Sequence, residues 1–561
     1  MSPQVCWVEE FEEKDTDTMI RRSVMQLLVF LCLALIGSVA CGSSDIAERS
    51  PERKIVTVGG GRIEGIPSGR DKDVFVYRGV PFAEPPVGTL RWRPPVPAAP
   101  WEGVRDGGLA APACMQRRLE GGDDSFYDTG VREMSEDCLY LNVWSAAGSG
   151  DSVPVMVWIH GGGLVVGNSA DVSYDGAALA KRGVVVVTLN YRLGVFGYLA
   201  HPLLSAESEH EASGNYGTLD QVAALEWVQR NIAAFGGDPN RVAIFGESAG
   251  SWSVNQLMAT PLARGLFHAA IGQSGGGFGS AGGSAQSKGT LESAGELFVD
   301  GLLSSETEVV LDAMRSASAE EVLAVPASFG GSSANVDGWV FPDTIYNIFA
   351  AGRQHDVPVL IGSNANEFGG FLGGPRGAET VAEYRETVAA EYGDFAEAFF
   401  SVYPADDDIA AQQARRESST DARFGWEMRT WARMMQTVTS PAYLYFFSRV
   451  PHAADADRYG AYHTAEIPYV FDNFGVSTSP HANRDYDDTD RALSEVLASY
   501  WVNFAGSGNP NGDGLPVWPV YDLAEDAVLE IGDTIQVSQG IRKDRLDFFD
   551  RFYESERGQP N

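Results

Sequence analysis

The sequence predicts an α/β fold in which helices cover a large, mostly parallel central sheet. From Lys54 onward, short runs of β-branched and other apolar residues alternate with amphipathic stretches, which is typical of parallel strands joined by helices. A Gly-x-Ser-x-Gly motif lies between one such run and a stretch that can form a helix. No segment repeats at a period of about 20 to 50 residues, which argues against a solenoid or a propeller.

Several segments are predicted as buried strands because they are short, apolar and flanked by glycine or polar turn residues. They are Val155–Ile159, Val184–Leu189, Val242–Phe245, Ala269–Ile271, Val357–Ile361 and Tyr443–Phe447.

Two longer stretches are predicted as helices with one face in the core. Asp220–Phe235 and Arg491–Phe504 carry apolar residues at helical spacing, namely Val222, Leu225, Val228 and Ile232 in the first and Leu493, Val496, Leu497, Tyr500 and Phe504 in the second. Gly275–Gly283 and Gly330–Ser333 are expected to be loops. Because nothing resembles an interdomain linker, we expect residues 54–555 to form a single domain.

The composition is that of a globular protein with a strong excess of acid. The chain has 561 residues, of which 44% are hydrophobic, and 41 basic residues stand against 76 acidic ones for a net charge of −35. Such a surface repels phosphate backbones and anionic lipids, so neither nucleic acid nor a membrane surface is an expected partner. The charge is more typical of a highly soluble protein.

The N-terminal region predicts export. Arg21 and Arg22 precede the apolar run Val24–Ile36, which small residues follow, and this is the pattern of a secretory signal peptide over residues 19–40. Residues 1–18 are acidic and come before the point where such a signal begins. They are expected to be a non-native upstream extension.

Two modes of cleavage fit the end of this signal. Ser38 and Ala40 suit ordinary signal peptidase, which would release a soluble secreted protein. The small residues that end at Cys41 also resemble a bacterial lipoprotein box, in which Cys41 would carry the lipid and residues 41–53 would form a flexible tether. The expected location is then the periplasm or cell envelope, with the lipid as the only contact to membrane.

Cysteine usage agrees with export. Of the five cysteines, Cys6 and Cys32 lie in the region to be removed and Cys41 is the candidate lipid site. Only Cys114 and Cys138 remain in the folded body. An isolated pair in an exported protein favours one disulfide, and two buried free thiols are the alternative.

The Gly-x-Ser-x-Gly motif of Gly246–Gly250 offers Ser248 as a candidate nucleophile. A nucleophile elbow needs a strand, a strained turn and a helix whose N-terminus faces the serine. Ser248 has Val242–Phe245 before it and the helix-compatible Ser251–Met258 after it. A second motif places Ser274 before a glycine-rich loop, so Ser274 is expected to be structural.

A glycine run is the candidate oxyanion loop. His160-Gly-Gly-Gly follows the strand Val155–Ile159, and glycines expose backbone N–H groups that no side chain shields. Gly162, Gly163 and Ala249 are therefore the expected oxyanion donors. His160 is expected to shape this loop rather than to act as a base.

Together these motifs resemble those of type-B carboxylesterases, a family that includes cholinesterases and bacterial esterases. The resemblance covers about residue 54 to at least 535 and includes Arg78–Ala83, Pro85–Gly88, Glu136–Trp144, Asn190–Gly194, Gly236–Pro239 and Gly246–Ser251. It implies the α/β-hydrolase fold, with loop insertions forming a gorge, and places a disulfide at the matching Glu-Asp-Cys that ends at Cys138.

The same resemblance implies the other members of a catalytic triad. Glu367 ends a segment similar to the one that holds the family's acid, and His463 lies in the segment Tyr462–Phe471, which is similar to the one that holds its base. The order Ser, Glu, His is that of the α/β-hydrolase fold. His452 and His481 are also late in the chain, but they lack this motif.

The implied activity is hydrolysis of a small carboxylic ester through an acyl-enzyme, with no metal or organic cofactor. Lactones, thioesters and amides share this chemistry and stay open as substrates. A non-catalytic binding protein on the same fold is the alternative from another class. Cholinesterases carry a Trp where this chain has Asp128, which argues against choline esters, and Leu164, Val165 and Val166 suggest an aliphatic wall beside the oxyanion loop.

Overall fold

The computed structural model describes residues 53–117, 133–148, 150–279, 284–303, 309–326, 333–368, 380–475 and 484–558. The signal segment, Cys41, Asp128 and His481 lie outside these ranges, as do residues 1–52 as a whole and most of the predicted Gly330–Ser333 loop. The described residues belong to one compact unit.

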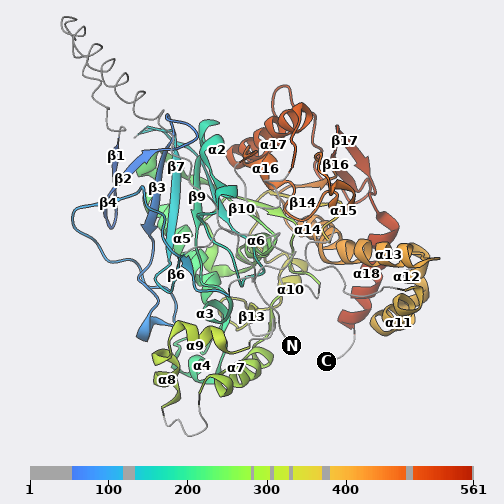
Figure 1. The fold of residues 1–561 in the computed structure, drawn as a ribbon, viewed down its shortest axis with the longest axis horizontal. Coiled ribbons are helices and arrows are strands. Elements are labelled where there is room, and N and C mark those ends of the chain that lie inside the picture. The colour runs from blue at the N-terminus through green and yellow to red at the C-terminus, as the bar shows by residue number, and fades with distance from the viewer. Residues whose placement is uncertain are drawn as a thin grey trace, which may run out of the picture. The chain divides into compact units, whose positions relative to one another are not determined.

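A 13-stranded sheet forms the centre of this unit (Figure 1). Its strands follow the order β1 (Lys54–Val58), β2 (Gly61–Pro67), β3 (Phe75–Pro81), β7 (Tyr140–Ser145), β9 (Val185–Leu189), β8 (Val153–Ile159), β10 (Gly237–Glu247), β11 (Ala269–Gln273), β14 (Val359–Asn364), β15 (Ala442–Phe447), β16 (Ala527–Ile531) and β17 (Ile535–Gln539), with β4 (Val104–Asp106) beside β2.

The sheet is parallel in its middle and antiparallel at both ends. Neighbouring strands run parallel from β9 to β16. Strands β1, β2, β3, β7 and β9 pair antiparallel with one another, and β17 pairs antiparallel with β16. All the strands predicted from apolar runs fall in the parallel part, because only strands covered on both faces are apolar throughout.

Alternate side chains of each central strand feed two separate cores. On β8, Val155, Val157 and Ile159 pack into one hydrophobic cluster, whereas Met156 and Trp158 pack into the other. Helices α5 (Tyr216–Asn231), α6 (Ala249–Ala259) and α14 (Trp426–Met434) cover the first face. Helices α2 (Ala177–Lys181) and α17 (Asp488–Ser507) cover the second.

Both predicted helices are present, with boundaries that differ from the prediction. The first begins four residues earlier, as α5, and ends in a short 3-10 turn over Ile232–Phe235. The second is α17, which extends the prediction at both ends. Its predicted core residues are buried except Val496, which is half-buried.

The remaining helices lie in connections between strands, except α18, which follows the last strand. Figure 1 shows α7, α8 and α9 gathered with α4, and α11, α12 and α13 beside α18. Their bounds are α3 (Gly194–Tyr198), α4 (Pro202–Glu207), α7 (Lys288–Leu302), α8 (Val310–Ser316), α9 (Ala319–Ala324), α10 (Ile345–Ala350), α11 (Val381–Tyr392), α12 (Ala396–Val402), α13 (Asp408–Thr420), α15 (Ala456–Tyr459), α16 (Ile467–Val470) and α18 (Lys543–Gly558). Among the described residues, no helix combines the length and apolarity needed to cross a bilayer.

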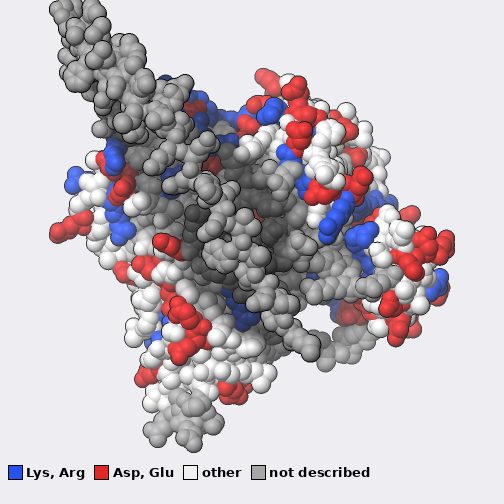
Figure 2. Space-filling model, viewed as in Figure 1, with Lys and Arg blue, Asp and Glu red and all other residues white. Residues whose placement is uncertain are grey.

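Cys114 and Cys138 are joined by a disulfide. Cys114 lies in the short strand β5 (Ala113–Cys114), which pairs with β6 (Met134–Ser135). The bond therefore ties the residues just before β7 to a segment that lies earlier in the chain. Figure 2 shows acidic side chains on the coloured parts of the visible face, with basic side chains among them.

Candidate active site

Ser248 occupies a sharp turn between β10 and α6. It has φ 58° and ψ −124°, a strained backbone for a residue with a side chain. A Cβ on Gly250 would lie 2.0 Å from the carbonyl oxygen of Ile159, and one on Gly246 would lie 2.5 Å from the carbonyl carbon of Gly250. The two glycines are therefore required for the turn to pass this close to β8, as a nucleophile elbow demands.

Ser274 has similar backbone strain but a different setting. It follows β11 with φ 56°, and its backbone N–H donates to the carbonyl of Gly362 over 2.8 Å. Its side chain is fully buried, and its hydroxyl has no hydrogen-bond partner among the described residues. The loop that follows, described as far as Gly279, contains no helix that could present a dipole to it.

His463 and Glu367 form a buried pair beyond the ends of two neighbouring strands. Glu367 follows β14 and His463 follows β15, and both side chains are fully buried. Nδ1 of His463 lies 2.7 Å from Oε2 of Glu367. Because a carboxylate only accepts, Nδ1 is the donor. The backbone N–H of Asn364 donates to Oε1 over 2.7 Å, which fixes the orientation of the carboxylate.

The end of β10 reaches this imidazole through Glu247. Its Oε1 lies 3.1 Å from Nε2 of His463, and its side chain is buried. Since Glu247 directly precedes Ser248, this contact brings the elbow and the histidine segment together. Glu247 occupies a variable position of the Gly-x-Ser-x-Gly motif, so the motif did not predict this contact. A carboxylate at the end of a strand buried on both faces was the signal that could have revealed it.

Glu466 lies at the centre of a second buried network that supports the histidine segment. Its Oε1 accepts from Nε2 of Gln273 over 2.9 Å, and its Oε2 accepts from Nδ2 of Asn364 over 2.6 Å. Asn364 also donates to the carbonyl of Tyr462 over 2.8 Å, and Trp501 donates to Oε1 of Gln273 over 3.0 Å. The network was not predicted. The only sign of this network in the sequence was that polar residues stand at the carboxyl ends of adjacent parallel strands.

Three buried carboxylates set the proton affinity of His463. Burial alone would lower its pKa, but the charge of Glu247 and the hydrogen bond and charge of Glu367 outweigh this and raise it to about 9. Burial, reinforced by the neighbouring carboxylates, raises the pKa of Glu247 well above its usual range and also raises that of Glu466. The site therefore concentrates acid–base groups whose titration is coupled.

The glycine run of the predicted oxyanion loop lies against Ser248. A Cβ on Gly161 would lie 3.1 Å from Cβ of Ser248 and 2.8 Å from the carbonyl oxygen of Glu247. Gly162 and Gly163 have φ 99° and 65°, conformations that strongly favour glycine. Ala249, the third predicted donor, is the first residue of α6, where backbone N–H groups have no partner within the helix.

His160, which precedes the glycine run, is held in place by Tyr191. Its ring is buried and stacks on Tyr191 at 4.6 Å, and the Tyr191 hydroxyl donates to the carbonyl of His160 over 3.0 Å. Burial lowers the pKa of His160 to about 4. These contacts suit a residue that shapes the loop.

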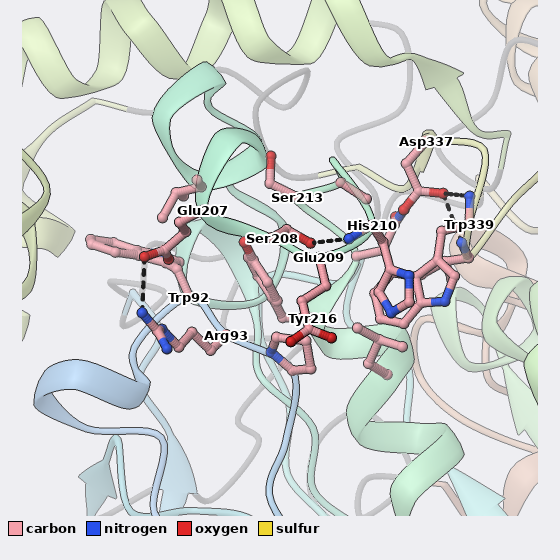
Figure 3. A pocket seen from close by; sticks show the side chains of 16 residues that line it. Trp92, Arg93, Glu207, Ser208, Glu209, His210, Ser213, Tyr216, Asp337 and Trp339 are labelled. Atoms are coloured by element: carbon pink, nitrogen blue, oxygen red, sulfur yellow. Dashed lines mark hydrogen bonds and ion pairs between the residues drawn. The ribbon is translucent and has the colours of Figure 1, made fainter.

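A cavity of about 250 Å³ lies elsewhere, between α4, the start of α5 and the segment around Asp337. Figure 3 shows Glu207 paired with Arg93, Asp337 bonded to backbone N–H groups, and the rings of His210 and Trp339 stacked. Neither Ser248 nor either member of the His463–Glu367 pair lines it. It is therefore separate from the candidate active site.

Comparison with known proteins agrees with the fold and the site. A solved structure of a PNB esterase superimposes with a TM-score of 0.74 at 30% identity, over 89% of this chain and all (100%) of that one. The architecture is thus that of the α/β hydrolases, as the sequence predicted.

Sequence relatives narrow the assignment. The profile of the carboxylesterase family matches residues 52–549. The chain is 37% identical over 512 residues to the fumonisin B1 esterase of Sphingopyxis macrogoltabida, with 88% of this chain and 90% of that protein aligned. It is 34% identical over 513 residues to the cocaine esterase of Homo sapiens, with 86% of this chain and 88% of that protein aligned. The chain therefore belongs to the carboxylesterase family and is a carboxylic-ester hydrolase.

Proposed function

We propose that Ser248, His463 and Glu367 form a catalytic triad that hydrolyses small-molecule esters through an acyl-enzyme. The observation that carries this proposal is the buried imidazole of His463, oriented by Glu367 on one nitrogen and turned toward the end of β10 on the other. A serine on a strained elbow, a base directed at that elbow and an acid behind the base are the parts that nucleophilic acyl transfer needs.

The reaction begins with attack by Ser248. Nε2 of His463 takes the hydroxyl proton while Oγ bonds to the ester carbonyl carbon, and the carbonyl π bond becomes an oxyanion. His463 then gives the proton to the leaving alcohol as the carbon–oxygen bond breaks, which leaves the acyl-enzyme. Water repeats the sequence with the same base and releases the acid. Glu367 keeps the proton of His463 on Nδ1 and stabilises the imidazolium.

The oxyanion is stabilised by backbone N–H groups of Gly162, Gly163 and Ala249. Support comes from the close approach of the glycine run to Ser248 and from the position of Ala249 at the N-terminus of α6. Donors that are already in place need not reorganise as the charge develops.

The names of two relatives and the residues beside the oxyanion loop support a proposal for the substrate class. The named relatives act on fumonisin B1 and on cocaine. Beside the glycine run, Leu164 is buried and Val165 and Val166 are half-buried, which provides an apolar surface. We propose organic esters with an apolar acyl or alcohol part.

The test is a substrate panel combined with covalent labelling. The purified protein is assayed on p-nitrophenyl esters of graded acyl length and on a matched thioester, lactone and anilide. It is then treated with a fluorophosphonate and digested for mass spectrometry. We expect the oxyesters to be the fastest substrates and a single phosphonylated residue, Ser248. A label on another serine, or an anilide cleaved faster than its matched ester, would contradict the proposal.

The pH dependence of kcat/KM gives a second prediction. Protonated His463 cannot accept the serine proton, so activity is lost as pH falls through the pKa of His463, and the raised pKa places this loss above pH 6.5, the ordinary value for histidine. Because Glu247 contributes to that raised pKa, Glu247→Gln should move the midpoint to lower pH. Profiles recorded between about pH 5 and about pH 10 would show the shift.

Glu466→Gln is the matched control for this shift. Glu466 is also buried, but its charge acts less strongly on His463 than those of Glu247 and Glu367. Its substitution should move the midpoint less than Glu247→Gln does. An unchanged midpoint in Glu247→Gln would show that this carboxylate does not control the base.

A further inference from the structure

The oxyanion loop ends at Gly167, and a side chain from a distant segment holds this end. Gln116 accepts from the backbone N–H of Gly167 at Oε1 over 2.8 Å and donates from Nε2 to its carbonyl over 2.8 Å. The side-chain amide thus forms a reciprocal pair of hydrogen bonds with one residue, as neighbouring strands do. Gln116 is only 5% exposed, so water does not compete freely for these bonds.

The position of Gly167 is coupled to the glycine run. Gly167 has φ 118°, and a Cβ there would lie 2.4 Å from Nδ1 of His160 and 2.8 Å from the carbonyl oxygen of Gly161. Within the loop, the N–H groups of Val165 and Val166 both donate to the carbonyl of Gly162 over 3.0 Å. The loop is a closed turn, so displacement of Gly167 would be transmitted to Gly162.

Gln116 is itself anchored. Its Nε2 also donates to the carbonyl of Cys114 over 3.0 Å, and Cys114 is bonded to Cys138. The carbonyl of Cys138 accepts from Nδ2 of Asn190 over 3.1 Å. Oδ1 of Asn190 in turn accepts from the N–H of Ser169 over 2.8 Å, just beyond the loop. The disulfide-bonded segment and the end of the oxyanion loop therefore form one connected unit.

We infer that Gln116 is a positioning residue that holds the oxyanion loop in its working geometry. This inference rests on the proposed function, because the loop matters only if it stabilises an oxyanion formed at Ser248. Gln116 acts through Gly167 and is not expected to touch the substrate. Its loss should therefore weaken stabilisation of the transition state more than it weakens substrate binding.

Gln116→Met tests the inference, because methionine keeps the length and bulk of glutamine but makes neither bond to Gly167. We expect kcat to fall by about 10- to 100-fold, a typical cost of misplacing catalytic groups, with KM changed less than about threefold. Affinity for a trifluoromethyl ketone should fall by a factor similar to that for kcat. Its hemiketal with Ser248 places an oxyanion in the same position as the intermediate does.

Gln354→Met is the matched control. Gln354 is equally buried and donates to Oγ1 of Thr437 over 2.9 Å and to the carbonyl of Met434 over 3.3 Å. Gln354 comes before β14, whereas Glu367 follows the other end of the same strand. Its substitution should lower thermal stability without lowering kcat per active site, counted by end-point fluorophosphonate titration.

Gln116→Glu provides a second test if the methionine variant does not fold. A neutral carboxylic acid can accept from Gly167 N–H and donate to Gly167 O, as the amide does, whereas an ionised carboxylate directs a charge at the carbonyls of Gly167 and Cys114. The ratio of its kcat to that of the unmodified enzyme should therefore fall as pH rises.

The outcomes separate this inference from the proposed function. If the unmodified protein is not labelled at Ser248, the proposed function fails. The inference alone is overturned if labelling is normal but Gln116→Met keeps kcat within about twofold, changes only KM, or loses no more kcat than Gln354→Met. The inference is also overturned if the ratio of the kcat of Gln116→Glu to that of the unmodified enzyme stays constant with pH.

Discussion

Replacing Ser248 by alanine is expected to abolish ester hydrolysis, with kcat reduced by about 10⁶-fold, as for other serine nucleophiles. The acyl-enzyme cannot form without Oγ, and the remaining oxyanion donors give only a small residual rate. The fold should persist, because the Ser248 side chain makes no capping bond to α6. Initial rates on a p-nitrophenyl ester, together with a thermal melt of the same sample, measure both quantities.

Ser274→Ala is the control for this experiment. Ser274 lies in the second Gly-x-Ser-x-Gly motif with a similar positive φ, but its hydroxyl has no partner among the described residues, so its removal breaks no bond seen there. The variant should retain most of the activity. An inactive Ser274→Ala beside an active Ser248→Ala would reverse the assignment of the elbow.

Glu367→Gln is expected to lower kcat by about 10⁴-fold while leaving KM nearly unchanged, as removal of the charge does in other triads. The amide can still accept from Asn364 N–H, so the side chain should keep its place. It no longer supplies the charge that stabilises imidazolium, and an N–H of the amide directed at Nδ1 would favour the wrong tautomer of His463. Single-turnover rates with a chromogenic ester would show whether the acylation step is affected.

The same substitution at Glu466 separates charge from position. Glu466 lies three residues after His463 and is also fully buried, yet its hydrogen bonds go to Gln273 and Asn364. Glu466→Gln should therefore cost much less activity than Glu367→Gln. Equal losses in the two variants would indicate that total negative charge, rather than the bond to Nδ1, is what His463 requires.

Local features of the sequence determined the parallel core and the predicted position of Ser248. The strands β8, β9, β10, β11, β14 and β15 were predictable because both faces are covered and each strand therefore contains a continuous apolar run. Ser248 was predictable because a strand, a turn and a helix are consecutive in the chain. Glu367 and His463 were predictable only through the resemblance of their segments to a known family, since nothing local distinguishes either residue.

The antiparallel edge was decided by the tertiary structure. Strands β1, β2 and β3 are only partly buried, so polar residues interrupt their apolar pattern and the runs are less distinct than those of the core. The pairing of β3 with β7 joins segments that are far apart in the chain. Apolar run length alone could not predict that order.

The same holds for the residues that surround the imidazole and the oxyanion loop. Glu247 meets His463 and Gln273 meets Glu466 because the sheet order brings the carboxyl ends of β10, β11, β14 and β15 close together. Gln116 meets Gly167 because the segment after β5 contacts the loop after β8. The sequence alone therefore determined which residues could carry the chemistry. Only the folded sheet decided which buried polar groups set their charge and position, because such contacts join residues that are remote in the chain.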